Sequence, residues 1–183
     1  MGSVRGMPNT NSRLLVAAEG TCAVVRVCGR ASFTCSADFK LLAYELLGKG
    51  VRCFILDLTG CVIMDSTFLG ILARFAQRLA EAPGGPHRLV LHNPNSRILD
   101  LLDNLGVSHL FEVRQVQATS DAVFQEVAPR ATDKVEATRV ALEAHQTLME
   151  ISPGNVAKFK EVAEFMANDL RRMEKGRGDG AGE

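Results

Sequence analysis

Apolar residues follow two different spacings along the first 116 residues, and each change of spacing marks a boundary between a strand and a helix. Continuous or alternating apolar runs are typical of strands, whereas apolar positions three and four residues apart are typical of helices packed on one side. The apolar runs predict strands at 13–18, 21–27, 53–58, 88–92 and 110–116. The helical spacing predicts three helices, capped near Ser36 or Asp38, near Ser66 and near Ser96.

The expected order of elements is therefore β-β-α-β-α-β-α-β. Glu19-Gly20 joins the first two strands, which favours an antiparallel hairpin. Helical crossovers between the later strands favour parallel pairing there. A mixed sheet covered by helices follows, which places the chain in the α/β class.

The stretch 51–80 carries the clearest chemical signal. An apolar strand that contains Asp57 is followed by Asp65, Ser66 and Thr67 at the start of a helix with an apolar stripe. Asp65 or Ser66 can accept hydrogen bonds from the first free N–H groups, and the helix dipole favours an anion there. A phosphate on Ser66 or Thr67 would meet those donors, although it would lie beside the Asp65 carboxylate. On residue chemistry alone, an ordinary Asp/Ser helix cap is the simpler interpretation.

The chain resembles the STAS family in two segments, Ile55-Leu56-Asp57-Leu58 and Met64-Asp65-Ser66-Thr67-Phe68-Leu69-Gly70. The resemblance covers residues 12–116 and is strongest to the bacterial anti-sigma factor antagonists. In that branch, a kinase that doubles as an anti-sigma factor phosphorylates the Ser directly after the Asp, which by position is Ser66. The resemblance also implies that the helices lie mainly on one face of the sheet.

Two positions depart from the pattern of that branch. Phe68 stands where the branch usually has Gly, and a bulky apolar group there is expected to alter the surface that the kinase reads. Ser32 stands where related antagonists often carry an Asp near the phosphorylated Ser. The departures leave open a different partner or a domain that binds without being phosphorylated. The expected partner-binding residues are Ser32, Asp65, Ser66, Thr67 and Phe68, with Ser66 as the first and Thr67 as the second choice for phosphorylation.

The resemblance ends at residue 117, and the rest of the chain has a different pattern. A short helix is expected at 119–127, ended by Pro129. From 132 onward, apolar positions at helical spacing flank a turn at 152–155, which predicts a helical hairpin with one apolar seam per arm. Two arms alone bury little surface, so the seam must pack on the sheet domain, a second copy or a different protein. The expected organisation is a flexible leader 1–11, a STAS domain 12–117, a helical extension 118–175 and a disordered tail 176–183.

Composition limits the classes of partner. The 21 basic and 21 acidic residues among 183 give no charge excess that would favour nucleic acid or a membrane surface. With no Trp and one Tyr, the chain also lacks the aromatic platforms of single-strand binders. No apolar run approaches the roughly 20 residues of a spanning helix, and no apolar signal core follows the start. We therefore expect a soluble, cytoplasmic protein without nucleic-acid or membrane contacts.

The sequence does not favour an enzyme. Asp57-Leu58-Thr59 lacks the second carboxylate of an aspartyl-phosphate phosphatase, and Ser66 lacks the Gly-x-Ser-x-Gly elbow of a hydrolase. The four histidines have no metal-ligand spacing, and the five cysteines, without a Cys-x-x-Cys pair, are expected to be buried reduced thiols. We expect no catalysis, no cofactor and no metal.

The resemblance implies a partner switch. Its expected partners are an anti-sigma factor serine kinase and a phosphatase, with phosphorylation of Ser66 as the control. The alternative is a non-phosphorylated STAS scaffold or ligand-sensing module that self-associates, as a homodimer, through its C-terminal helices.

Overall fold

The structure, a computed structural model, describes residues 12–85, 87–117 and 122–178. The expected leader 1–11 and residues 179–183 of the expected tail lie outside this part of the chain. The elements follow in the order β1 (Arg13–Glu19), β2 (Cys22–Ala31), α1 (Phe33–Gly48), β3 (Cys53–Asp57), β4 (Cys61–Met64), α2 (Ser66–Ala80), β5 (Leu89–His92), α3 (Ser96–Asn104), η1 (Ser108–Leu110), β6 (Phe111–Arg114), β7 (Gln125–Glu126), α4 (Lys134–Ile151), η2 (Pro153–Asn155) and α5 (Val156–Gly178).

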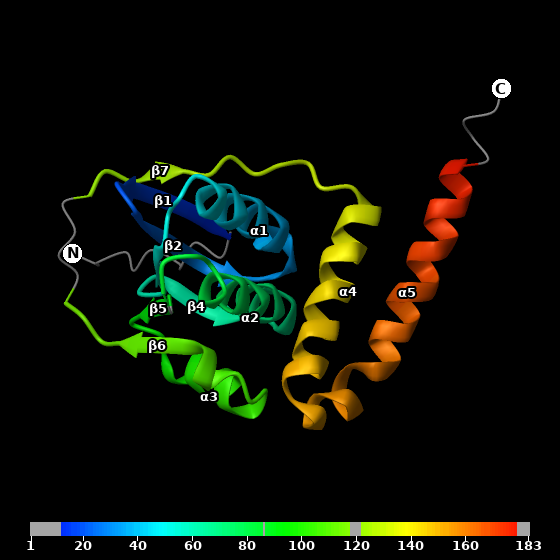
Figure 1. The fold of residues 1–183 in the computed structure, drawn as a ribbon. Coiled ribbons are helices and arrows are strands. Elements are labelled where there is room, and N and C mark those ends of the chain that lie inside the picture. The colour runs from blue at the N-terminus through cyan, green and yellow to red at the C-terminus, as the bar shows by residue number, and fades with distance from the viewer. Residues whose placement is uncertain (1–11, 86, 118–121, 179–183) are drawn as a thin grey trace, which may run out of the picture.

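A mixed sheet organises these elements. Its strands lie in the order β6-β5-β3-β2-β1-β7, and β4 pairs with β2 beside this path. β1 and β2 form the expected antiparallel hairpin, whereas β2, β3, β5 and β6 pair in parallel. Figure 1 shows α1 and α2 side by side against the sheet. The α/β class and the mixed sheet are confirmed.

Two strands were not expected. β4 is short, and it extends the pairing of β2 past a register shift after Gly29. β7 lies where a helix at 119–127 was expected, and that expectation is wrong for the described residues because Gln125 and Glu126 pair with β1. Without β7, β1 would be an open edge with unpaired backbone groups, so pairing outweighs the local helix-cap signal.

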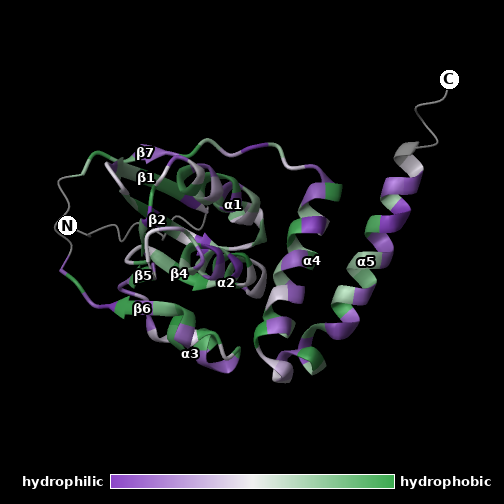
Figure 2. Ribbon diagram, in the orientation of Figure 1, coloured by the Kyte–Doolittle hydropathy of each residue, from purple (hydrophilic) through white to green (hydrophobic). Residues whose placement is uncertain are grey.

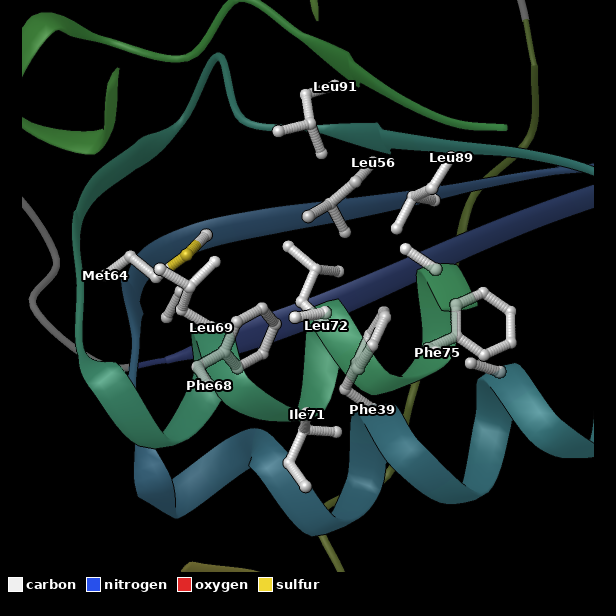
Figure 3. Packing of buried hydrophobic residues seen from close by; sticks show 14 of the residues in the cluster. Phe39, Leu56, Met64, Phe68, Leu69, Ile71, Leu72, Phe75, Leu89 and Leu91 are labelled. Carbon is white, nitrogen blue, oxygen red and sulfur yellow. The ribbon is translucent and has the colours of Figure 1, made fainter. Parts of the chain in front are cut away.

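α2 packs against the sheet and supplies much of the core. Figure 3 shows Leu56, Leu89 and Leu91 on the strands, facing the α2 side chains. The Phe75 ring lies 4.8 Å from the Phe54 ring centre and also contacts the rings of Phe39 and Tyr44.

The C-terminal hairpin packs on the sheet domain through α4, which is one of the three surfaces expected for its apolar seam. α4 lies along α1 and α2, and α5 lies along α4, farther from the sheet (Figure 1). Figure 2 shows hydrophobic and hydrophilic bands alternating along α4 and α5, as helices with one apolar side require. Val140, Ala144 and Leu148 of α4 join the main core cluster.

Two helix boundaries differ from the expectation. α1 begins at Phe33, not after Ser36 or Asp38, because its first N–H group has an acceptor from a distant segment. α5 continues through Gly178, so the expectation of a disordered tail is wrong for 176–178.

We expect Phe75→Ala to lower the free energy of unfolding by about 3–5 kcal/mol, because it leaves a cavity among three aromatic rings. Urea unfolding measures the change. The matched control is Phe165→Ala, since Phe165 is 68% exposed on α5 and should change stability by less than about 0.5 kcal/mol. Equal losses in the two variants would contradict the packing described for α2.

Candidate functional site

The candidate site lies where β2 and β4 end together. Ala31 and Met64 are register partners at the ends of these parallel strands, and the Asp65 N–H donates to the Ala31 carbonyl at 2.9 Å. The turn into α1 and the turn into α2 therefore lie side by side. The structure thus brings Ser32 close to Asp65 and Ser66, although 32 residues separate the two turns along the chain.

Asp65 caps two helices with one carboxylate. Its Oδ1 accepts a hydrogen bond from Phe68 N, at 2.8 Å, inside the first turn of α2. Its Oδ2 accepts from Phe33 N, also at 2.8 Å, at the first residue of α1. The Ser32 hydroxyl makes no cap bond to α1 and instead lies 2.8 Å from Thr34 Oγ1. Asp65 therefore fixes the two helix starts relative to each other.

Ser66 is the first residue of α2 and is half-buried. Its Oγ lies 3.2 Å from Nε2 of His145 on α4. The His145 ring stacks on Phe159 of α5, with 4.9 Å between ring centres, and the residue is 6% exposed. Burial lowers the pKa of His145, and the negative charge of Asp65 opposes that shift in part.

The remaining two expected site residues do not lie on the surface. Phe68 is fully buried, with its ring 5.1 Å from that of Phe39, so the expectation that it alters a surface read by a kinase is wrong for this conformation. Thr67 is also buried. Both side chains point inward because α2 is covered on more than one side.

Sequence reasoning missed three residues beside the site. Phe33 is 62% exposed at the start of α1, and Ile63 is exposed near the end of β4. Both give the site an apolar margin, which only the pairing of β2 with β4 places there. His145 was also missed, because no local pattern in a helical hairpin indicates which distant hydroxyl it meets.

Asp57, the last residue of β3, belongs to a structural network with Thr59 and Arg26. Its carboxylate accepts from Thr59 N at 3.0 Å, from Thr59 Oγ1 at 2.6 Å and from Arg26 Nε at 2.7 Å. Burial raises the pKa of Asp57, but these bonds outweigh burial and leave it below its ordinary value. Arg26 also lies over the Phe124 ring, 4.0 Å from its centre.

The thiols differ from the expectation of buried cysteines. All five are unpaired, but only Cys35 and Cys61 are buried, whereas Cys22 is exposed. Burial raises the pKa of Cys61 to about 11, which leaves this thiol protonated at neutral pH.

Within the described residues, no group of three or more His, Cys, Asp or Glu side chains could hold a metal ion. No described helix is both long and apolar enough to cross a membrane.

Comparisons with known proteins agree with this architecture. The model of the STAS domain family matches residues 14–123, which ends before α4 and α5. No curated protein matches the chain significantly by sequence.

Several solved structures are similar to part of this chain at low sequence identity. The NMR structure of TM1081, a Thermotoga maritima protein, is 16% identical with a TM-score of 0.50, covering 63% of this chain and 91% of that one. The anti-sigma factor antagonist SpoIIAA of Bacillus, in its unphosphorylated form, is 18% identical with a TM-score of 0.49, covering 57% and 89%. An anti-sigma factor antagonist from Mycobacterium paratuberculosis is 17% identical with a TM-score of 0.49, covering 62% and 91%.

We expect Asp65→Ala to lower the free energy of unfolding by about 2 kcal/mol, because both helix starts lose their acceptor. Asp65→Ser should lose about half as much, since one hydroxyl can still accept from Phe68 N but cannot also reach Phe33 N. Thermal unfolding of the three proteins measures the difference. A serine variant as stable as the unsubstituted chain would show that the bond to Phe33 contributes nothing.

Acid should destabilise the chain through His145. Because burial lowers its pKa from 6.5, the unfolded chain binds a proton at pH values where the folded chain does not. The stabilising contribution is complete above pH 6.5 and is lost as the pH falls below it. Urea unfolding measures the free energy of unfolding at about pH 7.5 and about pH 5.5. Its decrease between the two pH values should be smaller for His145→Gln than for the unsubstituted chain. Equal losses would exclude His145 as a source of the pH dependence.

Proposed function

This chain belongs to the STAS domain family, and we propose that it acts as a partner-switching protein of the anti-sigma factor antagonist type. In the unphosphorylated state, the surface around Asp65 and Ser66 binds an anti-sigma factor kinase and so releases a sigma factor. Phosphorylation of Ser66 by that kinase ends the binding. A phosphatase restores the first state.

The observation that carries the proposal is the position of Ser66. It is the first residue of α2, directly after an Asp that fixes the starts of α1 and α2, and it is half-buried, unlike buried Thr67. Of the two hydroxyl residues, only Ser66 lies at the N-terminus of α2 with a partly exposed side chain. That difference supports Ser66 over Thr67 as the phosphorylated residue.

The charge change gives the switch its physical basis. A phosphoserine carries about −1.5 to −2 charges at neutral pH. At Ser66 it would gain favourable contact with the α2 N-terminus but lie beside the Asp65 carboxylate. The surface would change from an apolar margin at Phe33 and Ile63 with one carboxylate to a strongly anionic one. A partner that buries this margin would then have to desolvate the phosphate, which opposes binding.

The proposal assigns the chemistry to partners. Phosphoryl transfer and hydrolysis belong to the kinase and the phosphatase, and this chain supplies the substrate hydroxyl and the docking surface. The STAS architecture typically serves binding without catalysis. In this proposal the protein works in the cytoplasm, where the kinase has ATP.

The second candidate function is a scaffold that self-associates through α4 and α5. One observation favours it: the large apolar side chain of Phe165 is exposed on α5. Against it, α4 already packs its apolar side on α1 and α2. Light scattering at several protein concentrations separates the two, because a scaffold of this kind should be a dimer that Phe165→Ala converts to a monomer.

We expect the unsubstituted chain and Ser66→Ala to capture an anti-sigma factor kinase from lysate of the source organism in the absence of ATP. With ATP, Ser66→Ala should retain the kinase while the unsubstituted chain loses it. Ser66→Glu should capture about tenfold less, because a fixed charge stands where the partner docks. Quantitative mass spectrometry of the captured proteins, with site mapping of phosphate on Ser66, measures both effects.

Ser96→Glu is the matched control. Ser96 is the exposed first residue of α3 and follows the capping residue Asn95, so it repeats the position of Ser66 on another helix. The Ser96→Glu variant should capture as much kinase as the unsubstituted chain. If Ser66→Ala and the unsubstituted chain respond alike to kinase and ATP, the proposed switch is wrong.

A further inference from the structure

The C-terminal hairpin holds the hydroxyl that the proposed function assigns to phosphorylation. Ser66 Oγ and His145 Nε2 are 3.2 Å apart, which joins the first residue of α2 to the middle of α4. Phe159 of α5 stacks on the His145 ring, which is buried. A segment that lies outside the matched family region therefore contacts the proposed switch residue directly.

The approach of α4 to α2 is close because residue 70 is a glycine. A Cβ atom at Gly70 would lie 2.6 Å from the carbonyl carbon of Ala144, which is closer than non-bonded atoms can approach. Both residues are buried. Only a residue without a side chain therefore lets α4 reach the depth at which His145 meets Ser66.

Polar contacts fasten α4 along the two helices beneath it. Lys40 of α1 pairs with Glu143. Arg74 of α2 donates to Thr147 Oγ1 at 3.0 Å and pairs with Glu150 at 2.6 Å. These pairs are partly exposed, and such pairs typically contribute little stability, so they orient α4 more than they hold it.

The closed contact also carries a cost. His145 Nδ1 is buried and has no hydrogen-bond partner among the described residues. A buried polar atom without a partner destabilises the state that buries it, and release of α4 to water would remove this cost. α4 therefore packs closely on α2 at Gly70, but the unpartnered His145 Nδ1 weakens the closed state. A segment that can separate from the sheet domain needs such a weakness.

We propose that the α4–α5 hairpin is an autoinhibitory cap on Ser66. In the closed state described here, α4 holds the Ser66 hydroxyl against His145 and occupies the side of α2 next to it. A kinase that binds at the start of α2 reaches this hydroxyl only after α4 has separated from α2. The cap rests on the proposed function for its meaning, because it regulates access to the same residue.

Thiol labelling can test the cap without any kinase. In Ser66→Cys, we expect a pulse of N-ethylmaleimide to modify residue 66 at least about tenfold more slowly than exposed Cys22. Adding Gly70→Ala should wedge α4 away from α2 and raise the rate at residue 66 about tenfold. Tandem mass spectrometry locates the label, and buried Cys61 reports unfolding of the sheet domain.

Gly48→Ala is the matched control for the wedge. Gly48 ends α1, and a Cβ atom there would meet nothing within 4 Å, so the same chemical change should leave residue 66 protected. Leu148→Ala is a second way to loosen α4, since Leu148 is fully buried and lies on α4 itself. Fast labelling of residue 66 without any wedge would overturn the cap. The cap would also be overturned if the labelling rate of Cys61 increased as much as that of residue 66 in both loosened variants. α4 could then not separate without unfolding of the sheet domain.

The kinase, once captured, separates this inference from the proposed function. Faster phosphorylation of Gly70→Ala than of Gly48→Ala would support the cap. Equal phosphorylation of both would overturn the cap and leave the partner switch intact. If neither variant nor the unsubstituted chain is phosphorylated on Ser66, the proposed function fails, whereas the thiol rates still decide whether α4 covers residue 66.

Discussion

The burial of α2 on two sides is the constraint on which the rest of the structure depends. Its apolar residues fill the space under the sheet, and its opposite side meets α4. A helix covered in this way needs large side chains toward the sheet and a small one where the second helix crosses. Phe75 and Gly70 meet these two requirements within one and a half turns. Within the first two turns of α2, only Ser66 retains partial exposure.

Asp65 connects this packing to the candidate site. One carboxylate satisfies the first N–H groups of two helices, so the same contact that closes the fold also positions the surface of the site. Because both carboxylate oxygens of Asp65 already accept backbone N–H groups, this residue is poorly suited to bind a further group in a reaction. The Ser66 hydroxyl caps neither helix, and its hydrogen-bond partner among the described residues is His145 of the hairpin.

Sequence periodicity was sufficient for the mixed sheet, its hairpin and most helix starts, because each depends on local spacing. The exceptions all depend on partners distant in the chain. β7 exists because β1 offers an open edge, and α1 begins early because Asp65 supplies its cap. The motif predicted a helix that begins at Ser66, with Asp65 or Ser66 as its cap, and α2 begins there with Asp65 as the capping residue. It could not indicate that Phe68 points into the core or that His145 reaches Ser66, since both follow from how α2 is covered.

The position of the hairpin at the end of the chain has a consequence during synthesis. Every strand of the sheet precedes α4 in sequence, so the sheet domain can form while α4 and α5 are still in the ribosome or the exit tunnel. At about 5–20 residues per second, the 45 residues from Lys134 to Gly178 take a few seconds to be made. For that interval, Ser66 of each new molecule is without its contact to His145. A newly made chain and a finished one therefore differ at this residue, and the rate of protein production itself sets how many molecules are in the uncovered form.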